Sequence, residues 1–266
     1  MSQSILNRNP PEADSRIWYG QHALQFVDLR LPKGPGPHPA IVSIHGGFWR
    51  NRYSLSHLGH LCAALTALGF ATWSLEYRRV GDAGGWPGTF HDVSAGAAHL
   101  FRHAADFAVD PARIGVLGHS AGGQLASWLA SMANVPVESP IRTEPLDFCA
   151  VVPMAGVLDL RQGWSEYLGN GAVEEFIGGP PEAFASRYDA ASPMALVPSS
   201  VPHLVVHGAE DEIVPVGMSE RYVAELGRRG QEASLLRLEG ADHFDVIDPN
   251  SAAWPVMSEA IVGMMS

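Results

Sequence analysis

The sequence has little positive charge, only two cysteines and no long hydrophobic run. Its 266 residues carry 17 Lys and Arg against 28 Asp and Glu, which gives a formal charge of −11 at pH 7. A negative charge of this size repels phosphate backbones and anionic lipid surfaces, so we expect neither nucleic-acid nor membrane partners. No segment reaches the roughly 18 uninterrupted apolar residues that a membrane span needs.

The scarcity of cysteine excludes a disulfide scaffold and a cysteine-rich metal site. Cys62 and Cys149 could form at most one bridge and lack metal-site spacing. We expect both to be buried packing residues. The N-terminus also lacks the basic start and the apolar stretch of a secretory signal. We therefore expect residues 1–16 to form a surface tail and the protein to be cytoplasmic.

The composition that remains is typical of a packed enzyme. Hydrophobic residues make up 46% of the chain and charged residues 17%, which is too apolar for a disordered protein. Because α/β folds of this length commonly form one domain, we expect residues 17–266 to be a single domain.

Short apolar runs alternate with amphipathic stretches along most of the chain. Residues 23–31 are typical of an antiparallel edge strand and lead into a turn rich in Gly and Pro. Buried strands are predicted at residues 40–44, 70–75, 113–117, 148–154, 203–207 and 233–238. Apolar residues at helical spacing follow most of these strands. The pattern predicts an α/β fold with a mostly parallel central sheet and helices on both faces.

The strongest local motif surrounds Ser120. The segment Gly118-His119-Ser120-Ala121-Gly122 matches the G-x-S-x-G nucleophile elbow and lies between a predicted strand and a predicted helix. The small glycines allow a sharp turn that exposes the serine hydroxyl above the sheet. We therefore predict that Ser120 is the nucleophile of a hydrolase.

A serine hydroxyl is a weak nucleophile and needs a histidine base that a carboxylate orients. Asp211 and His243 follow Ser120 in the expected order, each just past a predicted strand. Parallel strands bring all three residues to the same edge of the sheet. Asp159, after the preceding strand, is the alternative acid. The residues that flank the acid and the base are expected to face solvent or loop backbone: Glu210, Glu212 and Asp242.

The segment His45-Gly46-Gly47-Phe48-Trp49 follows a predicted strand and carries an HGG motif. Such a motif brings backbone N–H groups close to the nucleophile, where they stabilise the developing oxyanion. We predict the N–H groups of Gly47, Phe48 and Ala121 as the oxyanion donors. We expect His45 to hold this loop in place and not to act as a base.

One long segment breaks the regular alternation of strands and helices. Residues 157–200 are rich in aromatic side chains, and we interpret them as a short cap-like excursion over the carboxyl edge of the sheet. Its Trp164 and Tyr167 are predicted to bind the leaving group of the substrate. Trp49 and His119 are also predicted to contact the substrate, with packing of His119 within the elbow as the alternative. The bulk of Phe48 and Trp49 predicts a small acyl pocket, unless both rings point into the core.

Four segments together resemble the α/β-hydrolase superfamily of esterases and lipases: HGGFW, GHSAGG, GAEDEIVP and GADHFDVID. The HGGFW motif and the GVLDL segment at residues 156–160 resemble the arylformamidase (kynurenine formamidase) branch and related small carboxylesterases. The resemblance implies acyl transfer through Ser120 and a small-molecule ester or amide substrate. We expect the protein to be a monomer or homodimer. Arg78 and Asp92, in a region also similar to this branch, are expected to form a structural pair.

No cofactor or metal is expected. His99 and His103, like His57 and His60, have helical spacing but no obvious third ligand, and no Gly-rich phosphate loop opens a helix. Two alternatives stay open: an acylaminoacyl-type peptidase, and a non-catalytic binding protein on a hydrolase scaffold.

Overall fold

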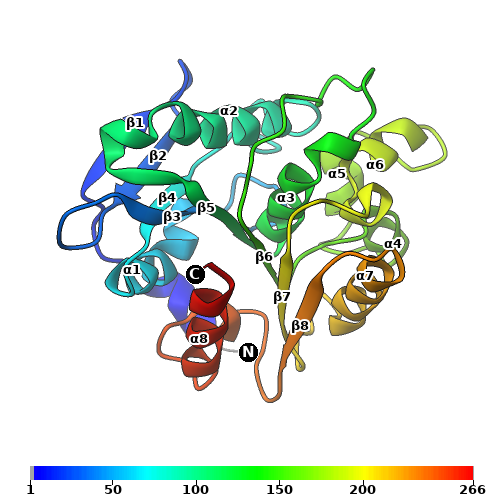
Figure 1. The fold of residues 1–266 in the computed structure, drawn as a ribbon. Coiled ribbons are helices and arrows are strands. Elements are labelled where there is room, and N and C mark those ends of the chain that lie inside the picture. Colours follow the sequence, from blue (N-terminus) through cyan, green and yellow to red (C-terminus); the bar gives the residue numbers. More distant parts are fainter. Residues whose placement is uncertain (1–2, 266) are drawn as a thin grey trace.

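The computed structural model describes residues 3–265, which are built around one eight-stranded sheet (Figure 1). The strand order is β1-β2-β4-β3-β5-β6-β7-β8. The strands are β1 (Ser15–Trp18), β2 (Phe26–Arg30), β3 (His38–Ile44), β4 (Ala71–Leu75), β5 (Val109–His119), β6 (Val151–Met154), β7 (His203–Gly208) and β8 (Ala233–Leu238). All neighbours from β4 to β8 in this order are parallel, whereas β2 pairs antiparallel with both β1 and β4. The predicted α/β class is confirmed.

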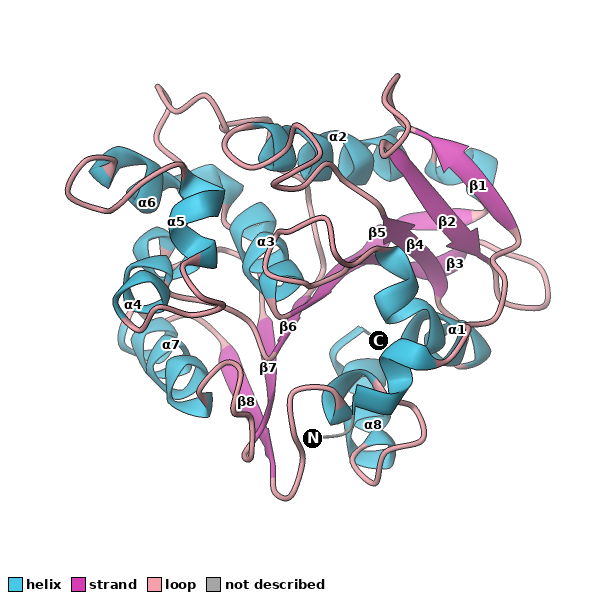
Figure 2. Ribbon diagram, turned by 180° about the vertical axis from the view of Figure 1, so that it is seen from behind, coloured by secondary structure: helices cyan, strands magenta, loops and turns pink. Residues whose placement is uncertain are grey.

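Helices cover both faces of the sheet, as Figure 2 shows. One face carries α2 (Gly88–Arg102), α3 (Ala121–Ala130) and α7 (Val216–Arg228), and the other carries α1 (Gly59–Ala67) and α8 (Trp254–Met265). Each face has its own core: Val42 is buried with the first group of helices, and Ile41 with the second. Adjacent strand residues thus enter opposite cores, as the two-residue period of a strand requires.

The excursion between β6 and β7 forms three short helices, α4 (Leu160–Ser165), α5 (Ala172–Ile177) and α6 (Ala185–Ala191). It packs on the loop that follows β3. The ring of Phe176 stacks on Trp49 with centroids 4.5 Å apart, and Arg50 Nε donates to Glu175 at 2.7 Å. A Cβ atom on Gly169 would lie 2.6 Å from the ring of Phe48. The excursion therefore touches the segment that carries the HGG motif.

The N-terminal region differs from the prediction. The segment predicted as an edge strand, β2, is flanked by β1, whose residues are mostly exposed and so lack the alternation that marks a strand. Residues expected to be a tail also pack on the domain: Ile5 is buried, and Arg8 pairs with Asp248. Short 3-10 helices occur at Gln3–Asn7, Leu55–Leu58, Ala104–Phe107, Met132–Asn134, Pro193–Leu196 and Asp245–Ile247.

Three smaller expectations concern the cysteines, the Arg78–Asp92 pair and membrane-spanning helices. Both cysteines are free, with Cys62 fully buried and Cys149 partly exposed. Arg78 and Asp92 form the expected pair, with two side-chain hydrogen bonds of 2.8 and 2.7 Å. Among residues 3–265, no helix is both long and apolar enough to cross a membrane.

Candidate active site

Ser120 occupies a tight turn between β5 and α3. Its backbone has φ 56° and ψ −120°, a region that side-chain-bearing residues rarely adopt. The flanking glycines permit the turn: a Cβ on Gly118 would lie 2.0 Å from the carbonyl oxygen of Gly122, and a Cβ on Gly122 equally close to that of Ile44. The Ser120 N–H donates to the carbonyl of Met154 on β6 at 2.8 Å. This is the geometry that the elbow motif predicts.

Asp211 and His243 are hydrogen-bonded to each other. The loops after β7 and β8 bring His243 Nδ1 to 2.6 Å from Asp211 Oδ2. The other carboxylate oxygen, Oδ1, accepts the backbone N–H groups of Ile213 and Val214 at 2.8 and 2.9 Å. Burial by itself would raise the pKa of Asp211, but hydrogen bonds from His207 and His243 outweigh it and hold the pKa well below its usual range. The carboxylate is therefore ionised.

The elbow and the histidine loop are joined directly. His119, the residue before Ser120, lies with its Nε2 2.8 Å from the carbonyl oxygen of His243, and the two rings pack with centroids 4.6 Å apart. A carbonyl can only accept, so His119 Nε2 is the donor. The bond fixes the backbone of the predicted base next to the predicted nucleophile.

Asp159, the alternative acid, has a different role. Its Oδ1 caps α4 by accepting the N–H groups of Arg161 and Gln162 at 3.0 and 3.1 Å. The flanking residues also match expectation: Glu210 and Glu212 are exposed, and Asp242 accepts backbone N–H groups of its own loop. The geometry thus favours Asp211 as the partner of His243.

The HGG loop runs beside the elbow. A Cβ on Gly46 would lie 2.9 Å from Ser120 Cβ, so the loop backbone passes directly along the serine. Gly47, Phe48 and Trp49 all have positive φ, at 111°, 52° and 55°. Left-handed backbone at two successive non-glycine residues is strained and is typical of functional sites.

His45 holds the loop in place, as expected. Its Nδ1 lies 2.8 Å from the Gly46 carbonyl oxygen and its Nε2 3.0 Å from Glu76 Oε1. Burial opposes ionisation of Glu76, but His45 and Arg79 outweigh it and lower the pKa of this carboxyl. Both ring nitrogens of His45 thus face oxygen atoms of the protein, which fixes the orientation of the ring. Tyr77 adds a hydroxyl bond to the His45 carbonyl at 2.7 Å.

Two predicted substrate contacts are wrong. Trp49 is fully buried, stacks on Phe176 and donates its Nε1–H to Gln124 at 3.0 Å. His119 is also fully buried, with Nδ1 bonded to His57 Nε2 at 2.7 Å and Nε2 bonded to His243. Both side chains are therefore occupied within the core and cannot border a substrate.

The other two predicted contacts lie in the excursion. Trp164 donates to Glu174 at 2.9 Å. Tyr167 is exposed and lines a surface cavity of about 560 Å³ together with Glu174 and Gly171. None of Ser120, Asp211 and His243 lines that cavity, so binding of the leaving group by these two rings stays a prediction.

The chain is similar to a known protein family and to several esterases. A protein-family model described as BD-FAE matches residues 27–226, most of the chain. This chain belongs to the BD-FAE family. Esterase LipC of Mycobacterium tuberculosis is 28% identical over 88% of this chain, and esterase LipQ of the same organism is 29% identical over 85%. The chain spans only 60% and 55% of the length of these two curated relatives.

Solved structures agree on the architecture of this BD-FAE chain. A truncated carbohydrate esterase from gut microbiota has a TM-score of 0.81 at 21% identity, covering 97% of this chain and 99% of the other. A Thermogutta terrifontis esterase has a TM-score of 0.77 at 24% identity, covering 97% and 94%. Likeness at this level of identity shows the fold alone, and it confirms the predicted α/β-hydrolase fold.

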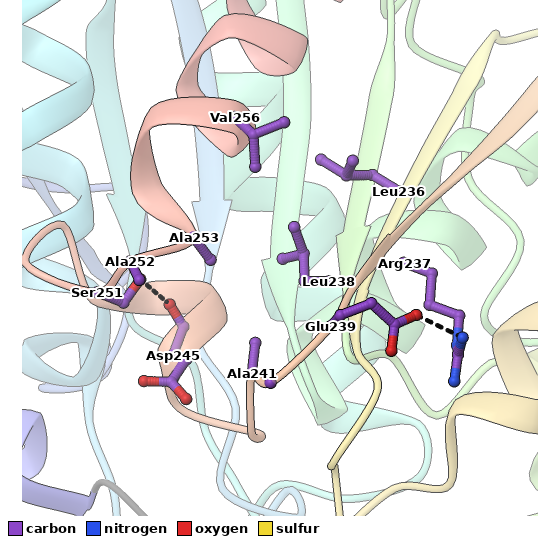
Figure 3. A pocket seen from close by; sticks show the side chains of 11 residues that line it. Leu236, Arg237, Leu238, Glu239, Ala241, Asp245, Ser251, Ala252, Ala253 and Val256 are labelled. Atoms are coloured by element: carbon purple, nitrogen blue, oxygen red, sulfur yellow. Dashed lines mark hydrogen bonds and ion pairs between the residues drawn. The ribbon is translucent and has the colours of Figure 1, made fainter.

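A further cavity of about 340 Å³ lies between β8 and the start of α8 in this BD-FAE structure (Figure 3). Ala241 and Asp245, which flank the histidine loop, line it together with the apolar Leu238 and Val256. His243 itself is not part of the lining. The cavity therefore adjoins the loop that carries the predicted base and not the reacting groups.

Sequence reasoning missed three residues that support the site: Glu76, His57 and His207. Glu76 and His57 act through partners far away in the sequence, and no local pattern indicates such contacts. His207 does carry a signal, because it stands four residues before Asp211 at the end of a buried strand.

Proposed function

We propose that this BD-FAE protein is a serine carboxylesterase that cleaves small-acyl esters through an acyl-enzyme on Ser120. The observation that carries the proposal is the 2.6 Å hydrogen bond between Asp211 and His243, beside a serine held in an elbow. The names of the relatives, two esterases of Mycobacterium tuberculosis among them, support ester cleavage.

The reaction follows from the proton positions. Asp211 is ionised and accepts the proton on His243 Nδ1, so the Nε2 lone pair of the base is free to take the Ser120 proton. The serine oxygen attacks the ester carbonyl, and the imidazolium that forms then protonates the leaving alcohol. Water attacks the acyl-enzyme by the same route, which releases the acid and restores Ser120.

The oxyanion would be held by the backbone. Ala121 is the first residue of α3, where N–H groups have no partner within the helix and the helix dipole favours negative charge. The Gly47 and Phe48 N–H groups belong to the strained loop that runs along Ser120. Removing one such donor commonly costs roughly 10²- to 10³-fold in kcat.

We propose that the acyl pocket is small because of the bulk of Phe48 alone. Trp49 is buried in the core, whereas the ring of Phe48 is only partly buried and packs against Gly169. Formyl, acetyl and propionyl groups should then be accepted better than long chains. The resemblance to arylformamidases also implies cleavage of aryl formamides. We include this activity in the proposal, because it would use the same catalytic residues and the same small acyl pocket.

One relative supports a second candidate function. The acylamino-acid-releasing enzyme of Arabidopsis thaliana is 26% identical over 77% of this chain, which spans 27% of that enzyme. Release of acylated amino acids from peptides would need the same nucleophile. Including an acetyl-alanyl anilide among the substrates distinguishes peptidase from esterase preference.

Ser120→Ala tests the proposal. The wild-type protein should bind a fluorophosphonate covalently and hydrolyse 4-nitrophenyl acetate, whereas the variant should do neither and keep its melting temperature. A loss of about 10⁴-fold or more in kcat is expected. More than a tenth of wild-type turnover in the variant would refute the role of Ser120. An unlabelled, inactive wild-type protein would favour the non-catalytic binding scaffold.

A further inference from the structure

A second histidine touches the acid of the triad. His207, at the end of β7, lies with its Nε2 3.2 Å from Asp211 Oδ2, the oxygen that also accepts from His243. The same nitrogen is 2.9 Å from the carbonyl oxygen of Val214. On the other side of the ring, Nδ1 is 2.7 Å from the hydroxyl oxygen of Ser219 on α7. His207 and Ser219 are fully buried.

These contacts determine where the proton of His207 lies. A carbonyl and an ionised carboxylate can only accept, so Nε2 carries the proton and points between Val214 and Asp211. The Ser219 hydroxyl can donate, and it does so to Nδ1. Every polar atom of the ring is thus used, which is the condition for a buried polar network that fixes one geometry.

We propose that His207 is a positioning residue that holds the Asp211 carboxylate on His243, by bonding Asp211 and Val214 at once. Its donor closes the loop between β7 and α7, because Val214 also gives its N–H to Asp211 Oδ1. The carboxylate cannot rotate about its side-chain bond without losing contacts to both oxygens. The inference rests on the proposed function of Asp211 and His243.

The same donor moderates the charge of Asp211. Oδ2 is shared by two N–H groups, so the negative charge that stabilises the protonated base is partly neutralised by His207. The hydrogen bond from His207 contributes to the depressed pKa of the acid, together with that from His243. Without His207, Asp211 would stabilise the imidazolium of His243 more strongly and would also point less accurately.

Two further histidines lie next to the Asp211–His243 pair: His119, which packs on His243, and His57, which is hydrogen-bonded to His119. His119 packs on His243, and burial together with the charges of His243 and His57 holds its pKa well below the usual value. Burial likewise lowers the pKa of His57 to about 3. Because both pKa values are lowered, a change in the pH profile near neutral pH on mutating His207 reports on Asp211 and His243.

Three variants test the proposal on 4-nitrophenyl acetate. His207→Leu removes the hydrogen-bond donor to Asp211. His207→Gln keeps a donor, because the side-chain amide N–H of glutamine can occupy the position of the histidine Nε2–H. The matched control is His203→Leu on the same strand, because His203 is equally buried but bonds Val201 and Tyr222 and not Asp211. We expect His207→Leu to lower kcat roughly 10- to 100-fold, the effect of one hydrogen bond to a charged group, with little change in KM.

We also expect the acid limb of the kcat/KM profile to move to higher pH in His207→Leu and to stay in place in the other two. His207→Gln should recover most of the wild-type kcat. Wild-type kcat and acid limb in His207→Leu would overturn the proposal, as would an equal kcat loss in His203→Leu at equal loss of melting temperature. If His207→Leu does not fold, the test falls to His207→Gln. An acid limb of its kcat/KM profile that is shifted from the wild-type position overturns the proposal, and an acid limb at the wild-type position supports it.

A readout without substrate separates this inference from the proposed function. The proton between His243 Nδ1 and Asp211 should give a strongly downfield ¹H NMR resonance. We expect this resonance to shift in His207→Leu and not in His203→Leu. A wild-type protein that hydrolyses no ester would sink the proposed function, whereas an unmoved resonance would sink the role of His207 alone.

Discussion

Replacing Asp211 by asparagine should disable the base by reversing the direction of one hydrogen bond. In the wild-type protein, Oδ1 accepts two backbone N–H groups and Oδ2 faces the two histidines. Backbone donors cannot reverse, so the amide oxygen of Asn takes the place of Oδ1. The amide NH₂ then replaces Oδ2 and points at His243 Nδ1 from 2.6 Å.

The consequence can be estimated from that geometry. His243 Nδ1 must become an acceptor, which moves the ring proton to Nε2, the nitrogen that has to receive the Ser120 proton. The base is then in the wrong tautomer, a change that costs about 10⁴-fold in kcat in serine proteases. That factor corresponds to about 5.5 kcal/mol of transition-state stabilisation.

The assay is kcat for 4-nitrophenyl acetate at pH 7.5, with the rate of fluorophosphonate labelling as a second measure. Asp159→Asn is the matched control, because asparagine caps a helix as well as aspartate does. The control should keep wild-type activity and melting temperature. An Asp211→Asn variant with more than a tenth of wild-type kcat, or the reverse ranking of the two variants, would refute the assignment of the acid.

Three further predictions follow from packing, burial and pocket shape. Gly122→Ala should destabilise the fold by about 1–3 kcal/mol and lower activity, because the new Cβ would lie 2.0 Å from the Ile44 carbonyl oxygen. The control is Gly227→Ala in α7, where the new Cβ meets no atom within 4 Å. This variant should be as stable as the wild-type protein, or more stable, in urea unfolding. The pKa of His57 falls from 6.5 in the unfolded chain to about 3 in the folded protein. This histidine should therefore lower the free energy of unfolding as the pH falls below 6.5, by at most about 1.4 kcal/mol per pH unit. The His57→Asn variant should lose less stability between pH 7 and 5, and a loss equal to that of the wild-type protein would show that His57 is not responsible. Values of kcat/KM for aryl esters of two to ten acyl carbons should fall with length, and a steady rise toward octanoyl would show a long acyl tunnel.

The sequence alone determined the fold class and the candidate triad. Strand–helix alternation is a local property, and parallel strands bring their carboxyl ends to one edge of the sheet. Residues that follow separate strands, such as Ser120, Asp211 and His243, can therefore be assigned to one edge of the sheet without any knowledge of the intervening packing. The elbow motif is also local in the sequence, since Gly118, Ser120 and Gly122 lie within five residues, although Gly122 packs against Ile44 of another strand.

Tertiary packing decided everything that depends on a partner from another part of the sequence. Trp49 could face the substrate or the core, and the position of Phe176 against its ring settled it for the core. His119 lost its predicted contact with substrate because His57 and His243 use both of its nitrogens. Hydrogen-bond partners of this kind depend on the distances and angles between side chains that are far apart in the sequence. The periodicity of the sequence therefore does not predict them.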